Sequence, residues 1–412
     1  MVCFMSKRIN LNSGKLIPQK IQLGYKQNKM SRLQKVLLFF VLLFFLYACR
    51  AGKNAQNTVY HLSQLRLKKN LSVPIDSLHT IVSQQLRGMV VDKKGNIYLK
   101  DVAKYKIDIL NSRAQYLGSM GRKGHGPGEF DFIMGNMSIL GDTLFILQYP
   151  SRLSMFSIPS GHLIQTDNIS RAKINGHPIG FPEKLTPLTN GNYEIISTLN
   201  TSFKSPLILS IYNHNLKPKD ILVHSYPPTN TFIYRNPGNN HAFGFSSSIL
   251  FAPHTEIAFG SHGFIYEAHS DSTHIYVYNS TGNKIRDISF KYNPIVLTQS
   301  DMDSLANLLP NNKWKNMFRK AIKRNNIKIP GNWMIMRKLL VDNKKRCWIE
   351  LVTPGKSTHT WWIFNKNGHP QWKFKLNRYV HLYTIRNGEV YGIWKKRGHY
   401  SRIMRYKIEG MN

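Results

Sequence analysis

Short apolar stretches separated by polar turns make up most of the chain beyond residue 80. β-Branched, aromatic and aliphatic residues alternate with Gly, Asn, Asp and Pro, as in strands joined by tight turns. The segment Met89–Gly121 shows the pattern clearly, with a strand, a polar turn, a second strand at Asn96–Leu99 and further strand–turn steps. The pattern predicts an all-β fold from about Ile81 onward.

The same unit recurs along the chain. Six copies can be read at 89–121, 137–169, 185–223, 251–290, 339–374 and 383–408. Units of about four strands at a spacing of roughly 40–50 residues are typical of β-propeller blades. Because one blade cannot bury both faces, the ring must close, and we expect a strand from 59–75, around Tyr60–Leu67, to join the last blade. A β-sandwich pair or a β-helix is the alternative.

One segment, near residues 298–325, departs from the β pattern. Thr298 or Ser300 can cap a helix that Pro310 ends, and a second, basic amphipathic helix is predicted after it. We expect this helical insertion to cover one end of the propeller. The alternative is that its basic helix lies on an anionic membrane or docks on a partner.

The linker between the first two units is rich in glycine. Gly121, Gly124, Gly126 and Gly128 precede Phe130, and such glycines let a loop pass close to other backbone. No Lys-Ser/Thr pair follows, so phosphate binding is disfavoured. The linker resembles the NHL-type blade linker, in which Phe130 would fill the groove between two blades.

The segment before Cys49 has the composition of an export signal. Arg32 and Lys35 precede Val36–Tyr47, an apolar run of 12 residues, whereas a membrane-spanning helix needs about 20. The sequence Leu46–Cys49 resembles the lipobox of bacterial lipoproteins. This resemblance implies cleavage before Cys49 and attachment of a diacylglyceryl group to its thiol. An uncleaved anchor helix is the alternative.

These features together divide the chain into three parts. Residues 1–48 are an N-terminal extension and signal peptide, 49–80 a tether with a possible ring-closing strand, and 81–412 the propeller. The linker, the six units and the lipobox together resemble the TolB-like and NHL-like six-bladed propeller lipoproteins of Bacteroidota. The resemblance implies an architecture and an envelope location more than an activity. Basic rather than acidic residues follow Cys49, which favours an outer-membrane anchor facing the periplasm.

The chain is strongly basic. It has 57 Lys+Arg and 21 Asp+Glu, and 8 of the basic residues but no acidic ones precede Cys49, so the mature part carries 49 − 21 = +28. Such a charge favours anionic lipids, lipopolysaccharide or acidic glycans as partners. An export signal and scattered rather than clustered basic residues argue against nucleic acid. The alternative is that the charge is spread over exposed turns.

Few residues are candidates for catalysis or metal binding. His262, His269 and His274 are near carboxylates in sequence and could bind zinc, although polar turn positions explain them better. Acidic residues are scarce, and several, such as Asp92 and Asp342, fall in turns. We therefore predict no catalytic residue and no cofactor, with calcium or zinc as the alternative.

The remaining cysteine and the tryptophans point to a packed core. Cys347 lies in a predicted strand and cannot form an intrachain disulfide after cleavage, so it is interpreted as a small buried residue. Trp361 and Trp362 alternate along a strand, so at most one of them is expected to be exposed. The sequence predicts a lipid-anchored envelope propeller that binds a protein or glycan partner. The alternative is a propeller hydrolase or lyase with a metal at the channel mouth.

Overall fold

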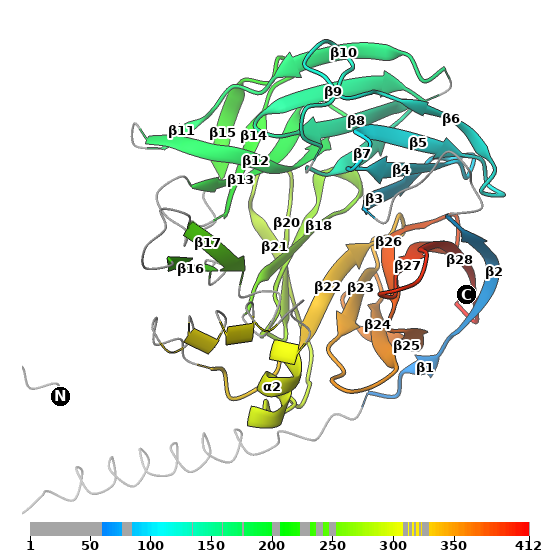
Figure 1. Cartoon of the computed structure of the whole chain (residues 1–412), viewed down its shortest axis with the longest axis vertical. Helices are drawn as coiled ribbons and strands as arrows, with labels where there is room; N and C mark the ends of the chain where they lie inside the picture. The colour runs from blue at the N-terminus through cyan, green and yellow to red at the C-terminus, as the bar shows by residue number, and fades with distance from the viewer. Residues whose placement is uncertain are drawn as a thin grey trace, which may run out of the picture. The chain divides into compact units, whose positions relative to one another are not determined.

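Six sheets, built mainly from consecutive antiparallel strands, form the blades of a β-propeller (Figure 1). The first and second blades are β3 (Leu86–Val91), β4 (Ile97–Asp101), β5 (Lys106–Leu110), β6 (Tyr116–Met120), then β7 (Met137–Leu140), β8 (Thr143–Gln148), β9 (Arg152–Ser157) and β10 (Leu163–Asn168). The third and fourth are β11 (Lys173–Ile174), β12 (His177–Pro187), β13 (Tyr193–Leu199), β14 (Leu207–Tyr212), β15 (Pro218–Leu222), then β18 (Thr255–Phe259), β19 (Ile265–His269), β20 (His274–Tyr278) and β21 (Lys284–Ser289). The fifth and sixth contain β22 (Met336–Val341), β23 (Cys347–Leu351), β24 (Thr358–Phe364), β25 (Pro370–Asn377), then β26 (Val380–Arg386), β27 (Glu389–Trp394) and β28 (Arg402–Glu409). The predicted all-β, six-bladed propeller is confirmed.

The computed structural model describes the part of the chain that forms this ring. The described residues are 60–75, 85–133, 135–158, 160–174, 177–199, 207–222, 231–235, 242–246, 253–307 and 329–411, with six helical residues between 312 and 323. Cys49 and the export signal lie outside them, as does most of the predicted second helix. No helix among the described residues is long and apolar enough to span a membrane.

The N-terminal segment attaches to two blades. β2 (Arg66–Pro74) pairs antiparallel with β28 and completes the sixth blade, while β1 (Ser63–Gln64) pairs in parallel with β25 of the fifth (Figure 1). The strand that joins the last blade therefore lies within the expected range 59–75, with most of its residues C-terminal to Tyr60–Leu67. The earlier residues instead bind the fifth blade, because the chain crosses the junction between the two sheets before it enters the sixth.

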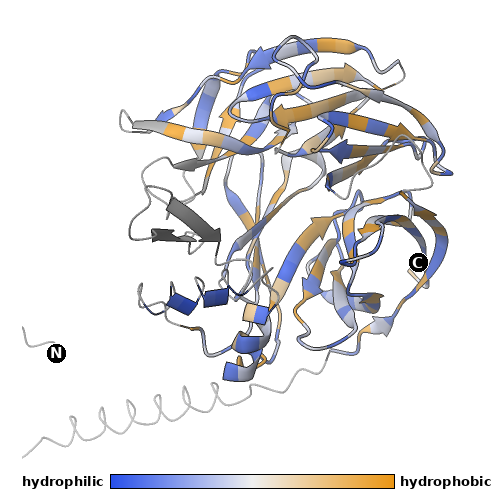
Figure 2. Cartoon of the chain, in the orientation of Figure 1, coloured by the Kyte–Doolittle hydropathy of each residue, from blue (hydrophilic) through white to orange (hydrophobic). Residues whose placement is uncertain are grey.

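The blades pack on one another through apolar clusters. Six clusters of buried residues each join two neighbouring blades, and together they run round the whole ring. Figure 2 shows the apolar residues concentrated in the strands. Cys347 is 1% exposed in the cluster between the fourth and fifth blades, which confirms the role predicted for it. Trp361 and Trp362 contribute to different clusters, because adjacent strand residues point to opposite faces.

Local turn chemistry repeats between blades. Asp92 Oδ1 accepts hydrogen bonds from the backbone amides of Lys94 and Asn96, at 2.8 and 2.9 Å. Asp342 Oδ1 makes the same two bonds two and four residues ahead, at 2.9 and 3.0 Å. These aspartates stabilise the turn between the first two strands of a blade, so their turn role is confirmed.

Two segments lie outside the blades. Helix α2 (Gln299–Asn307) begins at Thr298, whose Oγ1 accepts from the Asp301 amide at 3.2 Å while Asp301 Oδ2 accepts from the Thr298 amide at 2.9 Å. This reciprocal cap agrees with the helix start expected from sequence. The hairpin of β16 (Thr231–Arg235) and β17 (Ala242–Ser246) forms a separate two-stranded sheet that the repeat pattern did not predict.

Candidate functional site

The beginnings of the innermost strands gather at one end of the ring axis, here called the mouth. The inner strands of the six blades are β3, β7, β12, β18, β22 and β26, and most of them contact the inner strand of the next blade. The second strand of a blade runs antiparallel to the first, so its last residues lie beside the first residues of the inner strand. Side chains from these two positions therefore meet at the mouth from different blades.

Five basic side chains lie in or just after these two strands and are here called the basic ring. They are Arg87, Lys100, Lys184, Lys338 and Lys395. Three carboxylates, Glu183, Glu256 and Glu350, lie in the first or second strands of the third, fourth and fifth blades. The charges of the basic ring act on one another across blades: Lys395 is influenced by Arg87 and Lys338, and Lys338 by Lys184. The mouth therefore concentrates positive charge.

Lysines of the basic ring also join neighbouring blades. Each donates from Nζ to a main-chain carbonyl in or just before the next inner strand. The pairs are Lys100 with Gly135, Lys184 with Ile257, Lys338 with Leu382, and Lys395 with Leu86. Asn136 Nδ2 makes the equivalent bond to the Leu185 carbonyl at 2.8 Å. At the sixth junction the main-chain amides of Ile335 and Met336 donate to the Ser270 carbonyl, at 2.6 and 2.9 Å.

Three lysines of the basic ring, Lys100, Lys338 and Lys395, have pKa values below the ordinary value for lysine. Burial, with a smaller contribution from the Arg87 charge, lowers the pKa of Lys100 to about 8. Burial also lowers the pKa of Lys395 to about 8, assisted by the charges of Arg87 and Lys338. The pKa of Lys338 is lowered by burial too, although Glu256 and Glu350 act in the opposite direction. An anion that entered the mouth would relieve this mutual repulsion.

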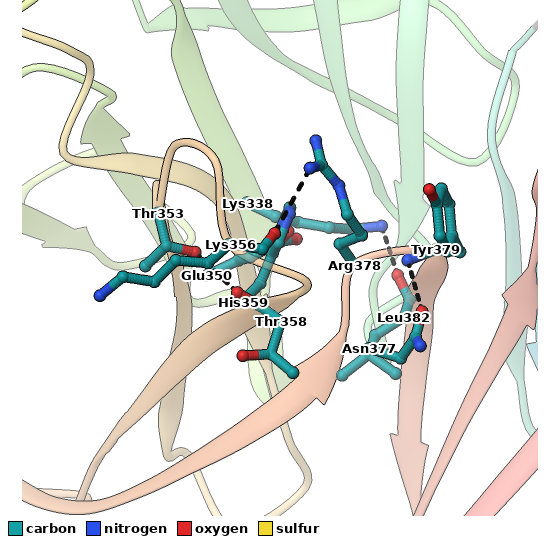
Figure 3. A network of polar contacts seen from close by, with 10 residues as sticks. All are labelled: Lys338, Glu350, Thr353, Lys356, Thr358, His359, Asn377, Arg378, Tyr379 and Leu382. Atoms are coloured by element: carbon teal, nitrogen blue, oxygen red, sulfur yellow. Dashed lines mark hydrogen bonds and ion pairs between the residues drawn. The ribbon is translucent and has the colours of Figure 1, made fainter.

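Two of the carboxylates at the mouth are held by histidines. Glu256 lies 3.1 Å from His254 Nε2, and Glu350 contacts His359 Nδ1. Burial alone would raise the pKa of Glu256, but the His254 contact and the charges of Lys184 and Lys338 keep it below its usual value. Figure 3 shows the Lys338 side chain reaching to the Leu382 carbonyl, close to Glu350 and His359.

Loops of the fifth blade are braced around this group. The main-chain amide of Arg378 donates to the Ser357 carbonyl at 3.0 Å. The Arg378 guanidinium donates to the Lys356 carbonyl at 3.3 Å (Figure 3). Thr353 Oγ1 donates to the Thr358 carbonyl at 2.9 Å within the same loop. Main-chain ties of this kind hold the loops at the mouth in a fixed position.

An aromatic ledge lies on the second and third blades, on the same side of the ring. Phe132 and Tyr149 have ring centroids 5.8 Å apart, and Tyr149 lies 4.7 Å from Phe181. Phe132 and Tyr149 are each 45% exposed, and Arg171 stacks on Phe181 at 4.5 Å. Exposed aromatic rings in mutual contact can stack on sugar rings. The sequence analysis did not predict this ledge, because it considered only the tryptophans as candidate aromatic residues.

The histidines proposed as metal ligands pair with different carboxylates. His269 Nε2 lies 3.5 Å from Glu267, whereas His274 Nδ1 lies 2.9 Å from Asp287. His262 belongs to the short 3₁₀ helix Ser261–Gly263, and its side chain is outside the described part of the structure. Within the described ranges, no group of three or more His, Cys, Asp and Glu side chains is arranged to hold a metal ion.

The glycine-rich linker packs against its own phenylalanine. Phe130 is fully buried in the cluster between the first and second blades. A Cβ atom on Gly121, which has φ +77°, would lie 2.1 Å from the Phe130 ring, and one on Gly124 would lie 2.1 Å from Glu129 Oε2. The Gly126 amide donates to Glu129 Oε2 at 2.9 Å, and the Gly128 amide donates to Thr166 Oγ1 at 3.2 Å. These contacts stabilise the blade junction.

The fold and the mouth define a six-bladed β-propeller with a basic opening, and solved structures share this fold. An exported protein of Bacteroides fragilis matches with a TM-score of 0.50 and 8% identity, covering 86% of this chain and 98% of that one. A DUF4221 family member from Bacteroides vulgatus matches with a TM-score of 0.52 and 11% identity, covering 84% and 98%. No protein-family model matches the chain, and no curated protein matches it in sequence. At these identities the likeness establishes the fold alone.

Proposed function

We propose that this chain is a binding module of the bacterial envelope, anchored through a lipid on Cys49, that holds an acidic glycan at its mouth. The observation that carries the proposal is the basic ring. Five basic groups from four blades face three carboxylates, two of which are already engaged by histidines. An anion is the ligand that this charge distribution attracts.

The bonds between blades leave the basic ring able to bind. An ammonium group has three N–H donors, and one carbonyl accepts one of them. Lys184, Lys338 and Lys395 are therefore held in place while they keep a charge at the mouth. Because these groups are fixed before a ligand arrives, less conformational entropy is lost on binding.

The aromatic ledge favours a glycan over other acidic polymers. Phe181 and Lys184 lie in the same strand, β12, so a stacking surface continues into the basic ring. A sugar ring could pack on Tyr149 while its acidic substituent reaches Lys184. The envelope location rests on the lipobox resemblance and on the exported protein that shares the fold. We propose likewise that the chain is related to the TolB-like or NHL-like propeller lipoproteins.

Binding of polygalacturonate to the full-length protein, measured by titration calorimetry at pH 7, tests the proposal. The probe has a matched neutral control, its methyl ester, with the same backbone and no charge. We expect binding of the acid only, and a loss of about tenfold in Lys184→Gln and Lys338→Gln. Lys407→Gln, an exposed residue of β28, should bind as the wild type does. Equal binding of the ester, or unchanged binding in both mouth variants, would overturn the proposal.

The anchor is tested separately by intact mass and membrane fractionation of the protein beside a Cys49→Ser variant. We expect the native protein to be cut before Cys49, acylated and membrane-bound, and the variant to be neither acylated nor retained. If both forms keep residues 1–48 and stay in the soluble fraction, the envelope location is wrong.

A further inference from the structure

A groove between the fifth and sixth blades has the composition of a second binding site. It has a volume of about 610 Å³ and is walled by β1 and β2, the end of β25 and one face of β28. Small-molecule sites are typically ~300–1,000 Å³, so the groove is large enough for a small ligand. We refer to it as the interblade groove.

All the charged side chains that line the interblade groove are basic. Arg66, Lys69, Lys375 and Arg402 contribute to the lining, and no Asp or Glu does. Arg402 is held in position by Ser72, to which its Nε and NH2 groups donate at 3.0 and 3.2 Å. In the part of the chain that the structure describes, Arg66, Lys69 and Lys375 form no ion pair with a carboxylate. The groove is therefore lined by four basic side chains and by no carboxylate.

The uncharged lining combines apolar side chains with the polar Gln64, Ser72 and Asn377. Leu65, Leu376 and Met404 are buried members of the cluster between the two blades, and Trp394 packs against that cluster. Alternation along β28 places Arg402, Met404 and Tyr406 on the groove side of the strand. Leu67 and Trp394 are half-buried, so an apolar portion of a ligand would pack on them while its charged group would lie among the basic side chains.

We propose that the interblade groove binds an anionic amphiphile, meaning a carboxylate or phosphate group joined to a short apolar chain. The basic side chains recognise the anion, and the apolar lining takes up the chain. A neutral ligand would leave the cations without an anionic partner, and a bare anion would leave the half-buried Leu67 and Trp394 uncovered. The groove is distinct from the mouth, because none of the basic ring lines it.

Titration of the full-length protein with decanoate tests this proposal, with fluorescence of Trp394 as the reporter. Decanoate is expected to bind and change the emission. Decyl maltoside, which has no charge, and inorganic phosphate, which has no chain, should bind at least tenfold more weakly. Vesicles containing phosphatidylglycerol distinguish a lipid headgroup from a free amphiphile. Binding to the vesicles but not to decanoate would show that the anionic amphiphile is a membrane lipid. Binding of neither decanoate nor vesicles overturns the proposal.

Substitutions distinguish decanoate binding in the groove from binding elsewhere on the surface. Arg66→Gln combined with Lys375→Gln should weaken decanoate binding at least tenfold, and Trp394→Phe should remove the fluorescence change. Lys407→Gln is the matched control, since Lys407 lies on β28 but does not line the groove. Lys338→Gln, in the basic ring, should leave decanoate binding intact, so a failure at the mouth is distinguishable from a failure here. Undiminished binding in the double variant would show that the groove is not the site.

Discussion

Lys184 donates a hydrogen bond from Nζ to the carbonyl of Ile257 at 3.0 Å, from the inner strand of the third blade to that of the fourth. Lys338 and Lys395 make the same kind of bond at two other junctions, the latter to Leu86 across 309 residues of sequence. The same ammonium groups thus close the ring and charge its mouth. Stability and ligand binding should consequently respond to pH through the same residues.

Binding of an acidic polymer at the mouth is expected to weaken as the pH rises through about 8. Lys100 and Lys395 have pKa values lowered to about 8, so they lose their positive charge between roughly pH 7 and 9. Polygalacturonate stays fully ionised throughout this range, so only the protein changes. Titration at constant ionic strength from pH 6.5 to 9.5 measures the effect. An affinity that stays constant to pH 9.5 would show that the charges of these lysines do not contribute to binding.

Lys100→Met isolates the contribution of one buried lysine to stability. The folded-state pKa of Lys100 is below its unfolded value of 10.5, so between pH 8 and 10.5 the unfolded chain binds more protons than the folded one. The free energy of unfolding of the wild type should therefore rise across this window relative to the variant. Lys100 is 2% exposed, and the difference amounts to at most about 3 kcal/mol.

Denaturant unfolding of the wild type and Lys100→Met at pH 7, 8.5 and 10 measures this difference. Lys407→Met serves as the control, because Lys407 is exposed and its substitution should give the same change at every pH. Parallel pH profiles for the wild type and Lys100→Met would mean that the lysine stays protonated in the folded state.

Gly121→Ala should destabilise the fold more than Gly141→Ala. Both glycines have positive φ, +77° and +59°, so each alanine is strained by about 1 kcal/mol. A Cβ on Gly121 would also overlap the Phe130 ring, whereas one on Gly141 meets nothing within 4 Å. Displacing a buried phenylalanine should add about 2 kcal/mol or more, since Phe→Ala changes in cores cost ~3–5 kcal/mol. Equal losses in chemical denaturation would show that Phe130 moves aside freely.

Much of the fold follows from local sequence signals. Asp92 and Asp342 bond amides two and four residues ahead, so their turns depend only on neighbouring residues and could be predicted. Thr298 and Asp301 cap α2 in the same local way. The repeat of strand and turn similarly predicts the blades. The hairpin of β16 and β17 lacked such a repeat and was missed.

The candidate sites depended on the closed ring. Lys100 and Lys395 belong to blades at opposite ends of the sequence, and only closure brings Arg87 close enough to influence both. The register of β1 and β2 against two different blades likewise creates the interblade groove. The sequence by itself determined the strands, the turns, the number of blades and the excess of positive charge. Tertiary structure alone decided which charges meet, because contacts between residues far apart in the chain depend on how the blades pack, and no local pattern encodes that.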